Sequence, residues 1–370
     1  MGKFKELEDI LLNNKEGNKV GILMHDNPDP DSMAGGVFFK EMLKEMGYAC
    51  PTILFGGEVD QQNKSFFTRL GINDNNRKNR PLNNIYHFNY DVNLRDLPQL
   101  KPEYFDKFIY VDHNGSNSRW AREGNIPPEK LLAVVDHHEC FKIPYAEFVD
   151  CREIGAASTI FAEYLINGAE KYFKKDALEM LYPLLYMGLQ IDTNYLREGA
   201  TEQDLEMIKI YAPKVDYHTV SSFSKFKRKK DWMDAYGRAY VTRENAYDRA
   251  NMASVGKIKS KKTRGAIPVA ATDLLKEVGI DTVFLFGFDN QYVDVAMRTE
   301  KEESLDYKSI IGSFPGAIGG GRNGAGRMQI PTSYFFNGNA CEYMKRVDDA
   351  ERIIKDRIKE NLCYALDKAS

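Results

Sequence analysis

Short apolar runs that alternate with helical patterns are the feature that most limits how the first half of this chain can fold. The runs have the length of buried strands and lie at 19–25, 48–57, 107–113 and 130–138. Apolar residues at helical spacing follow at 32–46, 155–166 and 176–192. Apolar strands that alternate with helices are typical of a parallel sheet covered on both faces. The pattern predicts an α/β fold whose N-terminal domain is a parallel sheet flanked by helices.

Acidic and imidazole side chains cluster where the predicted strands end. The segment "HDNPDPDS" follows the first run, "VDH" ends the run at 107–113, and "VVDHH" ends the run at 130–138. A fourth cluster, "IDT", comes at the end of the helical pattern at 176–192. The carboxyl ends of parallel strands share one edge of a sheet, where ligand crevices form, so we expect these clusters to converge.

Crowded carboxylates repel one another, so we expect a cation among them. Carboxylate oxygens and imidazole nitrogens without thiolates suit Mn²⁺ or Mg²⁺. Four aspartates and two histidines are too many for one catalytic ion and suit two cations about 3.5–4 Å apart. Each residue taken alone has an ordinary alternative, such as a turn for Asp29, a helix cap for Asp31 or a core position for His25. Four of the six histidines of the chain lie in these clusters, and this coincidence favours a metal site.

The second half of the chain differs from the first in composition and in its pattern of predicted elements. Residues 213–235 contain the polar, basic run "SSFSKFKRKKDW" and are expected to link the domain at 1–212 to a second one. That second domain, at 236–340, is predicted to be a smaller α/β domain with a mixed sheet. Residues 341–370 carry a helical apolar stripe, which predicts a helix that packs between the domains or between two copies of the chain.

Composition narrows the class of protein. A net charge of −3 and a pI near 6.2 argue against a protein that binds long double-stranded nucleic acid. No apolar run approaches the roughly 20 residues of a membrane helix, and the N-terminus is not typical of a signal peptide. The five cysteines are scattered without a C-x-x-C spacing, which is typical of reduced, buried thiols. We therefore expect a cytoplasmic protein with no membrane partner.

Five separated motifs together resemble one enzyme family. "HDNPDPDS", "VDH", "VVDHHE" and "GLQIDT" are similar to the successive motifs of the DHH phosphoesterase superfamily. "GGGRNGAG" is similar to the glycine-rich signature of the DHH-associated C-terminal domain. The resemblance runs in the right order from about residue 18 to about residue 332, and segments such as "AGRMQIP" resemble a prokaryotic branch that is common in archaea.

The resemblance implies two divalent cations, with manganese preferred and magnesium as the alternative. The implied metal ligands are His25, Asp29, Asp31, Asp112, His137 and Asp192. His25 and Asp29 would bind the first ion, whereas Asp31, His137 and Asp192 would bind the second. Asp112 would bridge the two ions.

The resemblance also implies which residues take part in catalysis. Besides Asp112, these are Asp136, which would orient an imidazole, and His138, which would face the scissile phosphate. Metal-ligating histidines usually need such an orienting partner.

The residues that the resemblance assigns to substrate binding lie mostly in the second domain. They are His113, Arg298, Gly319, Gly320, Gly321 and Arg322. The glycine-rich segment 316–327 is expected to be too poor in side chains for a packed element, and its N–H groups can approach a phosphate closely. Arg298 would grip a phosphate. Arg322 stands where the family usually has histidine, and an arginine holds charge or stacks on a base but does not exchange protons at neutral pH.

These expectations lead to a Mn²⁺-dependent phosphodiesterase that cleaves short oligonucleotides or dinucleotides to mononucleotides by two-metal hydroxide attack. Within the same superfamily, the alternatives are a phosphoadenosine-phosphate 3′-phosphatase, a polyphosphate or pyrophosphate hydrolase, and a single-strand exonuclease. A non-catalytic nucleotide sensor and a metal-stabilised scaffold are the alternatives outside enzymes. A short substrate is preferred because a polymer needs many basic contacts.

Overall fold

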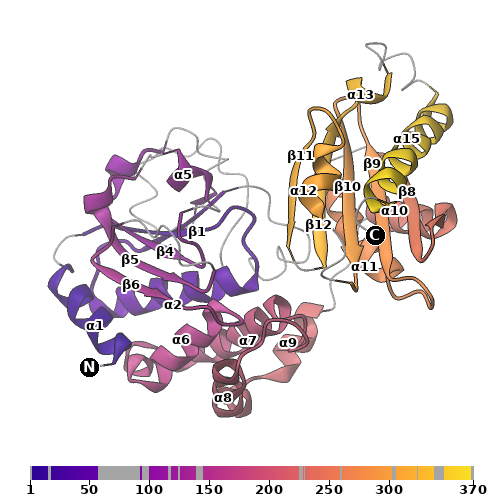
Figure 1. The fold of residues 1–370 in the computed structure, drawn as a ribbon. Coiled ribbons are helices and arrows are strands. Elements are labelled where there is room, and N and C mark those ends of the chain that lie inside the picture. Colours follow the sequence, from indigo (N-terminus) through magenta and orange to yellow (C-terminus); the bar gives the residue numbers. More distant parts are fainter. Residues whose placement is uncertain are drawn as a thin grey trace. The chain divides into compact units, whose positions relative to one another are not determined.

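Two compact units make up the chain (Figure 1). The computed structural model divides it into Met1–Phe226 and Lys227–Ser370. The residues that it describes are 2–15, 18–56, 92–93, 100–115, 118–123, 126–138, 145–224, 228, 230–258, 261–301, 306–322, 324–336 and 346–367. The division falls inside the predicted linker 213–235, where α9 (Tyr217–Ser224) and the first residues of α10 (Lys230–Thr242) are helical.

A six-stranded sheet forms the centre of the N-terminal unit. The strands are ordered β3–β2–β1–β4–β5–β6, and every neighbouring pair is parallel. Their bounds are β1 (Val20–Met24), β2 (Thr52–Phe55), β3 (Val92–Asn93), β4 (Lys107–Val111), β5 (Leu131–Asp136) and β6 (Phe148–Cys151). The parallel sheet predicted from the apolar runs is confirmed.

The strand order reverses between β1 and β4. The chain first adds β2 and β3 on one side of β1, and then returns to place β4, β5 and β6 on the other side. Such a reversal leaves a crevice at the carboxyl ends of the two central strands, because their connections leave in opposite directions. His25 follows β1 and Asp112 follows β4. The topology therefore brings the first two predicted clusters to one point.

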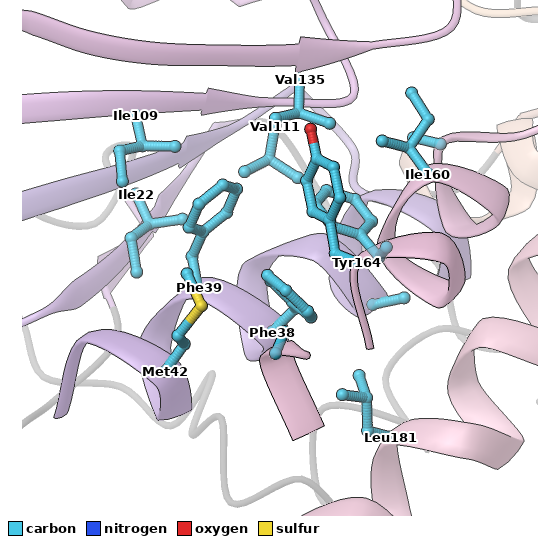
Figure 2. Close-up of a cluster of buried hydrophobic side chains, with 14 of the residues drawn as sticks. Ile22, Phe38, Phe39, Met42, Ile109, Val111, Val135, Ile160, Tyr164 and Leu181 are labelled. Carbon is cyan, nitrogen blue, oxygen red and sulfur yellow. The ribbon is translucent and has the colours of Figure 1, made fainter. Parts of the chain in front are cut away.

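Three helices pack on one face of this sheet (Figure 1): α1 (Lys3–Asn13), α2 (Pro30–Met46) and α6 (Ala157–Ile166). An outer layer completes the main core, with α7 (Lys175–Asp192) on α2 and α6 and α8 (Glu202–Tyr211) on α6. Figure 2 shows Phe39 and Met42 of α2 beside Ile22 and Ile109 of the sheet. A smaller cluster around Phe108, which packs near the short α5 (Arg119–Arg122), covers the opposite face. Short 3₁₀ turns lie at η1 (Pro102–Tyr104), η2 (Pro128–Lys130), η3 (Ala169–Tyr172) and η4 (Ala212–Lys214).

The C-terminal unit contains the mixed sheet that the sequence predicts. Its strands are ordered β11–β12–β10–β9–β8–β7, and only the β8–β9 pair among them is parallel. The bounds are β7 (Glu244–Tyr247), β8 (Ala250–Lys257), β9 (Thr282–Phe288), β10 (Tyr292–Thr299), β11 (Ile318–Arg322) and β12 (Ala325–Pro331). The helical elements are α10, η5 (Lys261–Gly265), α11 (Ala266–Leu274), α12 (Tyr307–Gly312), α13 (Ser333–Phe336) and α15 (Val347–Asp367).

Two expectations for this unit were wrong. The glycine-rich segment 316–327 is not a loop, because β11 and β12 within it pair in antiparallel register. Its glycines allow close packing: a Cβ on Gly321 or Gly326 would lie 2.5 or 2.4 Å from ring atoms of Tyr307. The apolar stripe of α15, expected to pack between the domains or between two copies, packs on the core of its own unit through Ala350, Ile354, Ile358 and Leu362.

The cysteines follow the sequence prediction only in part. Cys50 is free and buried, as expected, but Cys151 at the end of β6 is disulfide-bonded. No helix in the described part of the chain is both long and apolar enough to cross a membrane.

The close contact of α2 with the sheet gives a stability prediction. A Cβ on Gly35 would lie 2.3 Å from Cγ1 of Val111 and 2.4 Å from Cε2 of Phe161. Gly35→Ala should therefore lower the free energy of unfolding by about 1–3 kcal/mol, although alanine is the better helix former. Gly237→Ala in α10 is the matched control, because nothing lies within 4 Å of a Cβ there. It should stabilise the protein by roughly 0.5–1 kcal/mol in the same urea titration, and equal effects of the two variants would contradict the packing argument.

Candidate metal centre

The six residues predicted as metal ligands come from five elements that meet at the reversal point of the sheet. They are His25 after β1, Asp29 and Asp31 at the start of α2, Asp112 after β4, His137 after β5, and Asp192 at the end of α7.

The structure brings all six together in two of the three groups of possible ligands found among the described residues, the third being Asp112, His137 and His138. Within each group the ligand atoms lie within 4.8 Å of one another, and the two groups are His25, Asp29 and Asp112, and Asp31, His137 and Asp192. Asp112 lies between them: its Oδ2 is 3.4 Å from Nε2 of His25, and its Oδ1 is 3.3 Å from Nε2 of His137. One carboxylate therefore contacts both groups.

Both imidazoles turn the same nitrogen toward the carboxylates. Nδ1 of His25 donates to the backbone carbonyl of Asp26 at 2.9 Å, and Nδ1 of His137 donates to the carbonyl of Ile154 at 3.0 Å. A carbonyl only accepts, so Nδ1 carries a proton and Nε2 of the neutral ring carries a lone pair. That lone pair faces carboxylate oxygens, which is repulsive unless a cation or a second proton lies between them.

Several atoms of the cluster are buried without a hydrogen bond. Within the described residues, both carboxylate oxygens of Asp112 and Nε2 of His137 have no hydrogen-bond partner. Burial of such groups is costly unless a charge of opposite sign compensates them. Carboxylates and imidazoles without thiolates are the donors that Mn²⁺ and Mg²⁺ prefer. The residues present therefore fit a pair of divalent cations.

Two acids of the first cluster are also fixed by helix N-termini. Asp29 is the N-cap of α2: its Oδ1 accepts the N–H groups of Asp31 and the next residue at 3.0 Å, while its Oδ2 lies 3.3 Å from Nε2 of His25. Asp31 is fully buried and accepts the N–H groups of Ala157 and Ser158 at 2.7 Å. Those two residues begin α6, which has no side-chain cap of its own. Asp29, not Asp31, therefore caps α2, and Asp31 caps α6 instead.

Backbone strain is concentrated at the same place. Six of the described non-glycine residues have a positive φ: Asn27, Asp112, Asn194, Tyr195, Leu196 and Asp248. All but Asp248 lie in the segments that carry the ligands. A left-handed conformation costs a non-glycine residue about 1–2 kcal/mol and persists only where its surroundings hold it. The ligand Asp112 is itself among these residues, with a φ of 59°.

Gly188 is a site residue that our sequence reasoning missed. A Cβ there would lie 2.3 Å from Oγ of Ser158 and 2.9 Å from Cα of Asp31, so only glycine lets α7 pack directly on the start of α2. Asp192 follows one helical turn later on the same face of α7. The signal was present in the sequence as this i, i+4 spacing within "GLQID".

Asp136 orients the imidazole of His138 and not that of the candidate ligand His137. Its Oδ1 accepts the backbone N–H groups of His137 and His138 and also Nδ1 of His138, at 2.8, 3.2 and 2.8 Å. Nδ1 of His137 is instead held by Ile154, as described above. The ring of His138 also lies beside the cluster, with Nδ1 3.7 Å from Oδ1 of Asp112.

The assignment of His113 to substrate binding is wrong. Its side chain is fully buried, Nε2 donates to the carbonyl of Leu23 at 2.9 Å, and Nδ1 accepts the N–H of Gly115 at 3.0 Å. Burial lowers the pKa of His113 to about 4, so the ring is neutral and both nitrogens are used by the backbone. His113 ties the end of β4 to β1 and leaves no atom for a substrate.

The other predicted substrate residues lie on β10 and β11 of the C-terminal unit, next to β12. Gly320 pairs with Arg327, while Arg322 and Arg298 both pair with Ala325. The register places these positions on one face of the sheet, since residues two apart on a strand share a face. A Cβ on Gly320 would meet nothing within 4 Å, so the backbone is open there.

The neighbours of Gly320 do not share this open face. A Cβ on Gly319 would lie 2.3 Å from the carbonyl oxygen of Arg327, and one on Gly321 would meet the ring of Tyr307. All three glycines are exposed, and Gly320 is the one whose Cα faces open space on this side of the sheet.

Asp294 fixes the side chains on this face, and it was not among the predicted site residues. Asp294 is fully buried, and its Oδ1 accepts Nε2 of Gln329 at 2.7 Å and Nη2 of Arg327 at 3.2 Å. Its Oδ2 lies 3.1 Å from Nε of Arg264. Gln329 and Arg327 border a hollow of about 400 Å³, which Ile318, Gly319, Gly320 and Met328 also line.

The carboxylates dominate the protonation of the two imidazoles. Burial lowers the pKa of His25, but contact with Asp112 and Asp29 outweighs burial and raises that pKa to about 12. The same balance, with Asp112 and Asp192 as the partners, raises the pKa of His137 to about 12. Burial and the charge of Asp29 raise the pKa of Asp192 to about 6. Without a cation, protons take the positions between the acids.

These shifts predict how the stability of chelator-treated protein depends on pH. An imidazole whose pKa is 6.5 when unfolded and about 12 when folded stabilises the fold fully below pH 6.5 and loses that contribution as the pH rises toward 12. The free energy of unfolding should therefore fall between pH 6.5 and 9, by at most about 1.4 kcal/mol per pH unit for each of His25 and His137. Protein loaded with Mn²⁺ should lack this decline, since both imidazoles are then neutral. Identical pH profiles in urea titrations of the two forms would contradict the account.

Comparison with known proteins finds a similar domain in the part of the chain that carries most of the candidate ligands. A model of the DHH family N-terminal domain matches residues 19–189. The chain is 25% identical over 341 residues to an uncharacterized protein of Methanocaldococcus jannaschii; the match covers 92% of this chain but 63% of that protein, so the chain spans less than two thirds of its relative's length.

One solved structure shares the fold at low identity, and a second is more distantly similar. An exopolyphosphatase-related protein from Bacteroides fragilis is similar with a TM-score of 0.63 and 12% identity, over 98% of this chain and 97% of that one. RecJ from Thermus thermophilus, in complex with Mg²⁺, is similar with a TM-score of 0.40 and 11% identity, over 93% of this chain and 52% of that one. Residues 19–189, which carry five of the six clustered ligand residues at the reversal point of the sheet, are therefore similar to the N-terminal domain of the DHH family.

Proposed function

We propose that this protein hydrolyses phosphoester bonds with two divalent cations, manganese in preference to magnesium, and that its substrates are short oligonucleotides or dinucleotides. The observation that carries the proposal is the position of Asp112. This buried carboxylate directs each of its oxygens toward a different imidazole nitrogen, at 3.4 and 3.3 Å. A carboxylate shared by two ligand groups is suited to hold paired catalytic cations about 3.5–4 Å apart.

In this proposal the two ligand groups hold one cation each. His25 and Asp29 would hold the first, Asp31, His137 and Asp192 would hold the second, and Asp112 would contribute to both. When bound, the pair lowers the pKa of water and withdraws negative charge from the phosphate oxygens. The protein contributes a rigid frame, because helix N-termini and backbone carbonyls fix the ligands in advance.

Proton movement on the leaving group is assigned to His138. Asp136 is fully buried and holds Nδ1 of His138 at 2.8 Å, so the orientation of the ring is set. Nε2 is then the nitrogen that exchanges a proton with the substrate. Asp136 acts through His138 and does not itself need to reach the substrate.

The C-terminal unit supports a nucleotide over an inorganic polyphosphate. Because Nε2 of Gln329 donates to the carboxylate of Asp294, the amide orientation is fixed and Oε1 remains as an acceptor beside the hollow. Inorganic phosphate chains carry mainly acceptors at neutral pH, whereas the edges of nucleobases carry N–H donors. Arg327, anchored to the same carboxylate and half exposed, supplies a positive charge next to that acceptor. A nucleobase with its adjoining phosphate complements this pair.

Asp112 provides the test of the metal-dependent reaction. Asp112→Asn keeps the shape of the side chain but removes the charge common to both ligand groups. In Mn²⁺ it should lower kcat/KM for dinucleotide hydrolysis by a factor on the order of 10³. Asp176→Asn at the exposed start of α7 is the charge-matched control and should keep wild-type activity. An Asp112→Asn variant with unchanged kcat/KM would exclude the proposed centre.

A substrate panel separates the nucleotide proposal from its alternatives. Wild-type protein with Mn²⁺ is given a dinucleotide, a cyclic dinucleotide, phosphoadenosine phosphate and inorganic polyphosphate, and the products are identified by mass. We expect mononucleotides from the dinucleotide. Hydrolysis of phosphoadenosine phosphate alone, or of polyphosphate alone, would overturn the proposed substrate and leave the metal centre in place.

Gln329 tests recognition of the base separately from the reaction. Gln329→Leu keeps the size of the side chain but removes the acceptor, so the KM for the dinucleotide should rise roughly 3- to 10-fold, the effect of one hydrogen bond. The kcat should stay within twofold of wild type, because the reacting groups are untouched. Any measurable KM for tripolyphosphate should not change. A parallel rise in both KM values would show that Gln329 does not distinguish a base.

A further inference from the structure

We propose that Asp204, on α8, is a positioning residue for one of the two cation sites and not for the other. The proposal rests on the paired metal centre argued above and goes beyond it, because Asp204 itself touches no ligand atom. It acts through the segment 154–159, which connects the loop after β6 to the first residues of α6.

Asp204 holds one side of this segment. Its side chain is fully buried, Oδ2 accepts the N–H of Gly155 at 2.8 Å, and Oδ1 accepts the hydroxyl of Thr159 at 2.5 Å. The carboxylate also completes a capping box with Thr201, whose N–H and hydroxyl both donate to Oδ2 at 2.7 Å. One buried acid thus joins the start of α8 to the segment that precedes and begins α6.

The other side of the segment holds two ligands of one group. The carbonyl of Ile154 accepts Nδ1 of His137, and the N–H groups of Ala157 and Ser158 donate to both oxygens of Asp31. These contacts set the ring orientation of His137 and the plane of the Asp31 carboxylate.

The third ligand of that group is connected to the segment through its neighbour. A Cβ on Gly155 would lie 2.6 Å from Cγ2 of Thr193 and 2.6 Å from Oδ2 of Asp204. Thr193 directly follows Asp192 and is fully buried. Gly155 is therefore packed between Asp204 and Thr193, the residue next to Asp192. A shift of the segment would move all three ligands of the group.

The first group is positioned by different contacts. His25 is held by the carbonyl of Asp26, Asp29 is held by the N–H groups of the first turn of α2, and the backbone N–H of Asp112 donates to Val135. Loss of Asp204 should therefore loosen the site formed by Asp31, His137 and Asp192 and spare the site formed by His25, Asp29 and Asp112.

The test counts and locates bound Mn²⁺ in the full-length protein after removal of metal. Wild type should bind two ions in a calorimetric titration. Asp204→Ala should bind one ion with wild-type affinity and the second about 10- to 100-fold more weakly, the range found when a residue that orients a ligand is removed. In crystals soaked with a limiting concentration of manganese, the anomalous peak beside Asp31 should be the one that weakens.

Two further variants keep the test decisive. Thr201→Ala removes the capping hydroxyl of α8 but leaves the bonds of Asp204 to Gly155 and Thr159, so it should bind both ions like wild type. Thr159→Val removes one bond from the segment with little change in shape, and it should weaken the same single ion even if Asp204→Ala does not fold.

The outcomes separate this inference from the function on which it rests. A wild-type protein that binds no pair of ions would overturn the metal centre itself. A wild type that binds two ions, with Asp204→Ala and Thr159→Val weakening both ions equally or neither, would overturn the positioning role alone. Weakening by Thr201→Ala equal to that by Asp204→Ala would assign the effect to the stability of α8 and would also overturn it.

Discussion

Repulsion among buried carboxylates is the constraint on which the N-terminal unit depends. Asp31 and Asp112 are fully buried, and each lies in a group with a further aspartate and an imidazole whose ligand atoms are within 4.8 Å of one another. Such a cluster is stable only with compensating positive charge, supplied either by protons on His25 and His137 or by cations. The raised pKa values of the imidazoles and the proposed pair of cations are two responses to the same repulsion.

The frame around the cluster consists mostly of backbone groups. The start of α2 holds Asp29, the start of α6 holds Asp31, and the carbonyls of Asp26 and Ile154 hold the two imidazoles. Backbone donors at helix N-termini suit carboxylates because their partial positive charge needs no counterion. Since these groups belong to packed elements, the ligands are positioned before any metal binds.

This reliance on backbone explains which parts of the site were predictable. The parallel sheet and the meeting of the clusters after β1, β4 and β5 followed from apolar runs that end in acids and imidazoles, because strand ends share an edge. The full set of six ligands, with Asp192 at the end of a helix, followed from the family resemblance. The partners that orient those ligands did not follow, since the carbonyl of Ile154 and the N–H of Ala157 have no residue-type signature. Asp204 and Gly188 lie far along the chain from Asp31, which they help to place, so only the fold reveals their proximity. His113 was misassigned because the sequence did not show that both its nitrogens bind backbone.

The structure of the glycine-rich segment 316–327 was also not predictable from the sequence, and it changes the argument about substrate size. Its glycines indicated an open loop, yet most of them lie in the paired strands β11 and β12. The positive charge on the same face as Gly320 comes from Arg327, which donates a hydrogen bond to Asp294. The chain's net charge of −3 therefore averages an acidic centre in one unit and a local basic face in the other. A near-neutral total does not by itself exclude a long polyanion. The stronger argument for a short substrate is the hollow of about 400 Å³ beside Arg327, which lies within the range of small-molecule sites.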